Sequence, residues 1–107
     1  MSDSLSLTQN DITIESIIEA LLNVEETFPP KYLYRLSDLH EKDIKAIKEI
    51  WYEIPDWRRR GLIEDTETMF ERDYLLSYES LCRIGIEDEN PQIRFLALRS
   101  LGGYEAP

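Results

Sequence analysis

Residues 88–101 decide the fold, and they read DENPQIRFLALRSL. Pro91 follows a short polar run, and proline suits the first position of a helix because its fixed φ angle is already helical. Apolar residues then recur at helical spacing, with the small Ala97 inside the stripe, where a second helix can approach closely. The stretch therefore predicts a tight polar turn over residues 88–90 and a helix over residues 91–101 that packs on a neighbour.

The same spacing of apolar residues predicts further helices toward the N-terminus. They cover residues 13–24, 30–36, 41–53, 55–72 and 77–86, with Thr13 as the cap of the first and Pro55 as the first residue of the fourth. Gly102 and Gly103 are expected to end the last helix, because glycine readily adopts the left-handed conformation found there. No stretch pairs two strand-like runs with hairpin signals, so the sequence predicts an all-α fold.

The length and the two polar ends set the expected domain organisation. A chain of 107 residues holds one domain. Residues 1–10 lack periodicity, and we expect them to form a flexible tail. A single helical domain is expected over residues 11–103, with a flexible end over residues 104–107.

Composition excludes several classes of protein. The single cysteine, Cys82, cannot form an internal disulfide, which favours a reducing compartment, and we expect a cytoplasmic protein. No stretch approaches the roughly 18 apolar residues that a membrane helix needs, so no membrane partner is expected. The formal net charge of −10 serves solubility, and it can also steer the chain toward a basic partner.

No residue pattern indicates catalysis, a cofactor or a metal site. His40 is the only histidine, and we expect it to flank a helix start, since a metal site needs several converging ligands. Cys82 lies on an apolar helix face and is expected to be buried as a small hydrophobe. Carboxylates such as Glu64, Glu67 and Glu71 recur at helical spacing, which is typical of a solvated face and not of paired acid–base catalysts.

Residues 58–60 are the only basic run. Acidic residues flank them, so a solvated, salt-bridged face is the favoured interpretation, with Arg58 and Arg59 as alternative partner-binding residues. Nucleic acid is disfavoured as a partner, because phosphate binding needs an uncompensated positive face. Trp51 and Trp57 are expected in the core, although two tryptophans and six tyrosines could also form an aromatic binding surface.

The C-terminal stretch resembles the second half of a HEAT repeat, a member of the α-solenoid class. The matching residues, closest over residues 77–103, are Asp88, Pro91, Ile93, Arg94, Ala97 and Leu101. A weaker echo lies 36 residues earlier, where residues 55–58 align with residues 91–94 but Tyr52 stands opposite Asp88. Most of the chain is also similar to the N-terminal region of bacterial HEAT-repeat proteins.

The resemblance implies a short α-solenoid-like array of about six helices in antiparallel pairs. It implies that Asp88 and Arg94 pair along the solenoid or cap the helix, and that Asp88, Pro91, Arg94 and Ala97 are structural. Asp88, at the helix start, is also placed to accept backbone N–H groups or an arginine. The implied function is a protein–protein interaction or scaffolding module without catalysis. Two alternatives stay open: a helical subunit or accessory domain of an enzyme of the HEAT-like lyase type, and a nucleic-acid-binding helical repeat.

The last predicted helix carries apolar residues beyond its core-facing stripe. Phe95 and Leu98 lie on the flank that such a stripe leaves exposed, whereas a terminal repeat needs a polar outer face. We expect Phe95 and Leu98 to contact another protein or a second copy through this C-terminal helix, or to meet a further repeat of a longer array. The alternative is that Phe95 packs beneath the preceding helix.

Overall fold

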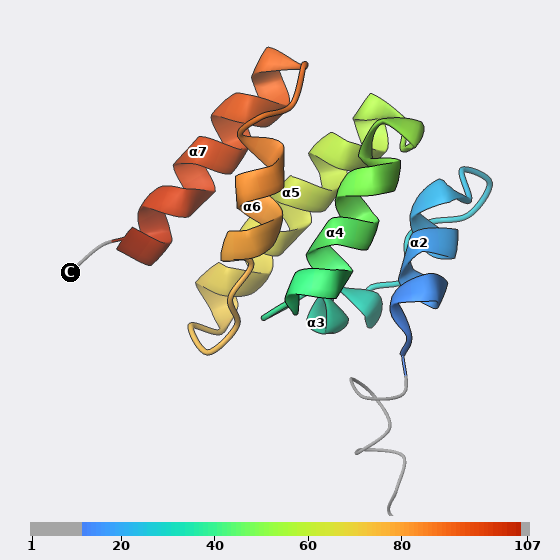
Figure 1. Ribbon diagram of the computed structural model, residues 1–107. Helices are drawn as coiled ribbons and strands as arrows, with labels where there is room; N and C mark the ends of the chain where they lie inside the picture. The colour runs from blue at the N-terminus through green and yellow to red at the C-terminus, as the bar shows by residue number, and fades with distance from the viewer. Residues whose placement is uncertain (1–11, 106–107) are drawn as a thin grey trace, which may run out of the picture.

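The computed structural model describes residues 12–105 of the chain, which contain six α-helices and one 3₁₀ turn (Figure 1). They are α2 (Ile14–Leu22), α3 (Tyr32–Arg35), α4 (Glu41–Ile50), η1 (Trp51–Glu53), α5 (Asp56–Arg72), α6 (Glu79–Gly85) and α7 (Pro91–Glu105). These described residues include no β-strand, so the predicted all-α class is confirmed. The tail predicted at residues 1–10, and residues 106–107 of the predicted flexible end, lie outside the described residues.

The helix starts follow the predicted signals closely. Thr13 caps α2, because its Oγ1 accepts a hydrogen bond from the Ser16 backbone N–H at 3.1 Å. Pro91 is the first residue of α7, as expected. Pro55 stands one position earlier than predicted and is the N-cap residue of α5, and His40 precedes α4 in the same position.

The predicted stop at Gly102 and Gly103 is wrong, because α7 continues through both glycines to Glu105. Neither glycine adopts the positive φ that ends a helix. Beyond them, the Tyr104 ring packs on Phe70 with centroids 4.4 Å apart, and its hydroxyl accepts a hydrogen bond from the Tyr78 N–H at 2.9 Å. These contacts hold the last turn of α7 against α5 and α6, so residues 104 and 105 belong to this helix and not to the expected flexible end.

The helices α6 and α7 form the closest pair, and Figure 1 shows them side by side. Gly85 of α6 faces Ala97 of α7, where an added Cβ on Gly85 would lie only 2.9 Å from the Ala97 Cβ. The expected close approach at Ala97 is therefore present, and Gly85 is the residue that permits it.

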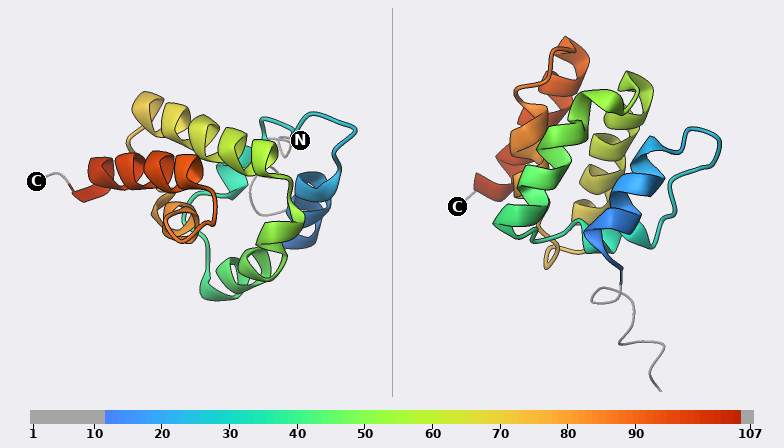
Figure 2. Two further views of the ribbon diagram at one scale, coloured as in Figure 1. Left: turned by 90° about the horizontal axis from the view of Figure 1, so that it is seen from above. Right: turned by 45° about the vertical axis from the view of Figure 1, so that its right-hand side comes forward.

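The helix α5 lies beside α7 and runs parallel to it (Figure 2). Arg60 contacts Gln92 near the start of both helices, at 3.1 Å, and Glu67 pairs with Arg99 further along both, at 2.7 Å. No helix within the described residues is long and apolar enough to cross a membrane.

One core joins the helices, and it includes Cys82, as predicted. Tyr78 links distant parts of it, since its buried hydroxyl donates to the Leu33 carbonyl oxygen at 2.8 Å. Trp51 is buried as expected, but Trp57 is not in the core: about half of it, 49%, is exposed.

Candidate functional site

Exposed apolar side chains gather along the outward side of α7. Phe95 is 62% exposed and Leu98 64% exposed, so the alternative in which Phe95 packs beneath α6 is wrong. Pro91 and Gly102 are exposed as well. The four residues follow the spacing i, i+4, i+7, i+11, which places them in one line along the helix. We call Pro91, Phe95, Leu98 and Gly102 the α7 outer face.

The α7 outer face lies opposite the buried side of the same helix. Ile93, Ala97 and Leu101 point into the core, and at roughly 100° per residue the outer face falls on the other side. The Arg99 guanidinium lies 5.8 Å from the Phe95 ring centroid and forms a two-bond ion pair with Glu67 of α5. The rim of the outer face toward α5 is therefore polar and held in place.

Gly102 has no structural reason to be glycine within the described part of the chain. A Cβ added there meets nothing within 4 Å, yet a glycine inside a helix costs about 1 kcal/mol relative to alanine. The residue leaves bare backbone at one end of the α7 outer face, where a second helix could approach closely.

The predicted exposed basic face is wrong for two of its three arginines. Arg58 and Arg59 are each only 7% exposed, and Arg60 alone stays at the surface. The Arg58 guanidinium donates to the carbonyl oxygens of Ala20 at 2.9 Å, Asn23 at 3.1 Å and Glu26 at 2.7 Å. These acceptors lie at the C-terminal end of α2 and just beyond it, where the helix dipole favours a cation. Arg58 is therefore a structural clamp on α2.

Arg59 is held by a buried polar network around Asp88. The Asp88 carboxylate accepts hydrogen bonds from Arg59 Nε at 2.9 Å and Trp51 Nε1 at 2.7 Å, and from the Asn90 backbone N–H at 2.8 Å. Arg59 Nη1 also donates to the Ile54 carbonyl oxygen at 2.6 Å. The guanidinium groups of Arg58 and Arg59 are therefore both engaged by hydrogen bonds within the fold.

Asp88 accepts a backbone N–H and an arginine, as expected, but the arginine is Arg59, and the side-chain pair between Asp88 and Arg94 does not form. Arg94 Nη1 donates instead to the backbone carbonyl oxygens of Asp88 at 2.8 Å and Glu89 at 3.1 Å. The Asp88 carboxylate points inward to α5, whereas the Arg94 side chain lies over the turn between α6 and α7. Both residues stabilise this turn, but Arg59 is the ionic partner of Asp88.

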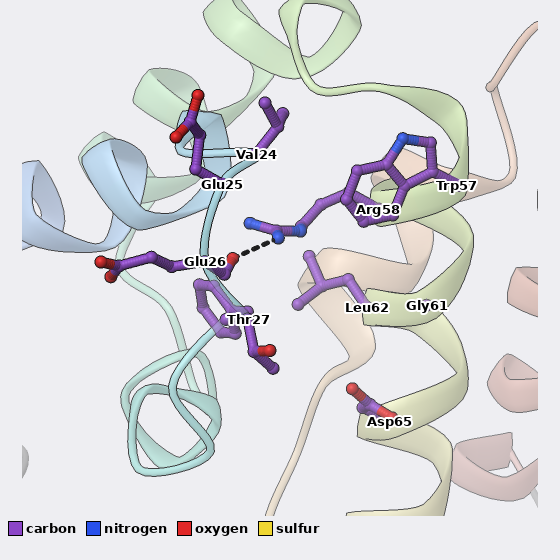
Figure 3. Close-up of a pocket in the computed structure, with 10 residues that line it drawn as sticks. Val24, Glu25, Glu26, Thr27, Trp57, Arg58, Gly61, Leu62 and Asp65 are labelled. Carbon is purple, nitrogen blue, oxygen red and sulfur yellow. Dashed lines mark hydrogen bonds between the residues drawn. The ribbon is translucent and has the colours of Figure 1, made fainter.

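A hollow of about 350 Å³ lies between α5 and the segment that follows α2 (Figure 3). We call it the α5 cleft, and it is lined by Val24, Glu25, Glu26, Thr27, Phe28, Trp57, Arg58, Gly61, Leu62 and Asp65. Half-exposed Trp57 and Val24 stand at its mouth, and the buried Leu62 supplies an apolar wall. The side chains of Glu25 and Glu26 point away from the hollow, and the Asp65 carboxylate lies at one end of it.

Sequence reasoning missed the α5 cleft, because it places Trp57 in the core. The available signal was Gly61, a glycine inside a predicted helix. At this position too, an added Cβ would meet nothing within 4 Å.

Neither a metal site nor a reactive thiol is apparent in residues 12–105. No group of three metal-binding side chains converges there. Burial raises the pKa of the Cys82 thiol to about 11, and the neighbouring Ser100 hydroxyl opposes this only in part. A thiol with this pKa is protonated at neutral pH and is a poor nucleophile.

Comparisons with known proteins find no matching family model, curated protein or solved structure. The fold and the surfaces described above define an all-helical protein with an exposed apolar helix face and a separate small cleft. The resemblance to HEAT repeats rests on the residues of the chain alone.

Proposed function

We propose that this chain is a protein-interaction module and that its α7 outer face binds an apolar helix face of the partner. The observation that carries the proposal is the exposure of Phe95 and Leu98, at 62% and 64%, side by side on one helix. Contiguous apolar surface rimmed by polar residues is typical of an interaction site, whereas a single exposed apolar residue is not.

The outer face has the layout of an interface. Its apolar line is flanked toward α5 by the Arg99–Glu67 ion pair and the Arg60–Gln92 hydrogen bond, which provide a polar rim. Tyr104 anchors the far end of α7 on α5 and α6, so the helix needs little ordering before it binds.

The partner that this face fits by its own symmetry is a second copy of the chain. The spacing 4, 3, 4 is the same in both directions along the helix, so two antiparallel α7 helices would place Phe95 against Leu98 and Pro91 against Gly102. Such a two-fold interface is the commonest way in which soluble proteins self-associate. Residues 91–104 contain two arginines and no acidic residue, which lowers the repulsion expected from a net charge of −10.

The size of the face predicts a weak dimer. Phe95 and Leu98 are already more than one-third covered, so burying the rest of two phenylalanines and two leucines contributes about 4–8 kcal/mol. Association costs about 4–15 kcal/mol. We expect a dissociation constant on the order of 1 mM, and a larger apolar partner would bind more tightly.

A HEAT-like scaffolding role is part of the same proposal. Three features support it: the close packing of α6 on α7, Asp88 in the turn between them, and Arg59 of α5, which forms an ion pair with Asp88. The scaffolding role depends on the outer face being an interface, because repeats of this class bind through stacked helix surfaces.

The test is capture of partner proteins by immobilised chain, with Phe95→Glu/Leu98→Glu compared with the wild type. The matched control is Tyr74→Glu/Leu75→Glu, which changes side chains that are 80% and 90% exposed in the segment between α5 and α6. We expect the α7 variant to lose proteins that the control retains, before and after nuclease treatment. Equal capture by both variants would contradict the proposal.

A further inference from the structure

We infer that the α5 cleft is a second binding site, which takes an apolar side chain from a basic peptide segment. The cleft is separate from the α7 outer face, since its lining comes from the segment after α2 and from a side of α5 that carries Trp57, Gly61 and Asp65. The inference therefore does not depend on the proposed function of α7.

The interior of the cleft suits one apolar anchor residue. Its volume of about 350 Å³ can hold a single large side chain, between Val24, Trp57 and Leu62. The Trp57 ring is 49% exposed, and the Arg58 guanidinium lies 5.0 Å from its centroid. Because Arg58 is itself fixed by three carbonyl oxygens, the indole is supported from one side before any ligand arrives. Tryptophans in this setting often dominate binding energy.

Gly61 lines the cleft and has no packing reason to be glycine. It lies inside α5, where glycine costs about 1 kcal/mol relative to alanine. Apart from the adjacent residues and backbone of α5 itself, no atom lies within 4 Å of the position of a Cβ. Because Gly61 has no side chain, the α5 backbone is exposed in the wall of the cleft, where a ligand can approach it closely.

The charge around the mouth favours a basic ligand. Glu25, Glu26 and Asp65 are exposed, and none of them has a basic partner among the ion pairs of the described residues. Arg58 is the only basic residue in the lining, and the carbonyl oxygens at the end of α2 already compensate it. An apolar side chain can therefore fill the interior while one flanking cation lies beside the Asp65 carboxylate at the end of the cleft. The carboxylates of Glu25 and Glu26, which point away from the interior, attract further cations at the outside of the mouth.

Calorimetric titration with three capped pentapeptides tests the inference. The first has a central leucine flanked by two lysines on each side, the second has glutamates in place of the lysines, and the third has glycine in place of the leucine. At 0.15 M salt, where exposed charges are screened beyond about 8 Å, we expect saturable binding of the first peptide only. Equal binding of the lysine–glycine peptide, or no heat with any peptide up to millimolar concentration, would overturn the inference.

Variants then locate the binding. Gly61→Leu fills the cleft and should weaken binding on the order of tenfold, whereas Gly102→Leu, a matched helical glycine on α7, should leave it unchanged. Glu25→Gln/Glu26→Gln should weaken it severalfold, and Glu41→Gln/Glu49→Gln on α4, with the same loss of charge, should not. Far-ultraviolet circular dichroism checks that each variant folds. Wild-type affinity in folded Gly61→Leu would place the binding elsewhere, and Phe95→Glu/Leu98→Glu should bind normally even if the α7 proposal fails.

Discussion

Arg59 of α5 donates through Nε to the Asp88 carboxylate at 2.9 Å, and the two side chains are almost completely buried. This ion pair joins the turn between α6 and α7 to α5, across 29 residues of sequence. The Trp51 indole N–H and the Asn90 backbone N–H donate to the same carboxylate. Both of its oxygens therefore accept hydrogen bonds, as a buried carboxylate requires.

Removing one member of this pair should strongly destabilise the fold. Because Arg59→Met leaves the Asp88 carboxylate buried without its counter-ion, we expect the free energy of unfolding to fall by about 3–5 kcal/mol. Denaturant titration measures it. The control is Arg83→Met, which breaks an exposed ion pair with Glu79 and should cost less than about 0.5 kcal/mol. Equal small losses in both variants would show that the buried pair contributes little.

Arg94 should matter less than Arg59. It donates to two backbone carbonyl oxygens in the turn but remains exposed, so Arg94→Ala should lower the free energy of unfolding by about 1 kcal/mol. The same denaturant titration compares them. A loss as large as that of Arg59→Met would restore Arg94 as the main support of the turn.

The Cys82 thiol should be inert in the native protein. Its pKa of about 11 leaves almost no thiolate at pH 8, and its side chain is buried. A disulfide reagent added at pH 8 should therefore react at the rate at which the protein opens, and at once in strong denaturant. Immediate stoichiometric reaction without denaturant would mean that the packing of α6 against its neighbours does not shield the thiol.

Asp65 should lower stability at neutral pH. Partial burial and, second, the neighbouring Glu64 carboxylate raise its pKa above the ordinary value. A carboxyl group whose pKa is higher in the folded than in the unfolded state holds its proton more tightly in the native protein. This stabilises the native state below the unfolded pKa, and the stabilisation is lost as the pH rises through the folded pKa. Asp65→Asn should therefore slightly raise the melting temperature at pH 7 and leave it unchanged near pH 3. An equal or lower melting temperature at pH 7 would contradict this assignment.

The sequence predicted local features better than distant partners. Apolar periodicity located all six α-helices of residues 12–105, and Thr13 and Pro91 marked two of their starts, because these signals depend only on neighbouring residues. It could not show that Arg58 and Arg59 are buried, since their acceptors lie 29 to 38 residues away or across a bend of the chain.

The same limit explains the other errors. The glycines at 102 and 103 read as a helix end, yet Tyr104 is held by Phe70 and Tyr78, far earlier in the chain. Phe95 and Leu98 could be predicted as exposed, because their position depends only on the helix period. The α5 cleft could not, because two segments that are distant in sequence form it.

The central claim, that the α7 outer face pairs with the same face of a second copy, is tested most directly by sedimentation equilibrium up to about 1 mM chain, the order of the dissociation constant expected here. Wild type, Phe95→Glu/Leu98→Glu and the Tyr74→Glu/Leu75→Glu control are compared in 0.15 M salt, which screens the repulsion between two acidic chains. We expect reversible dimerisation of the wild type and the control, and a monomer at every concentration for the α7 variant. A wild type that stays monomeric throughout, or an α7 variant that dimerises as well as the control, would contradict the claim.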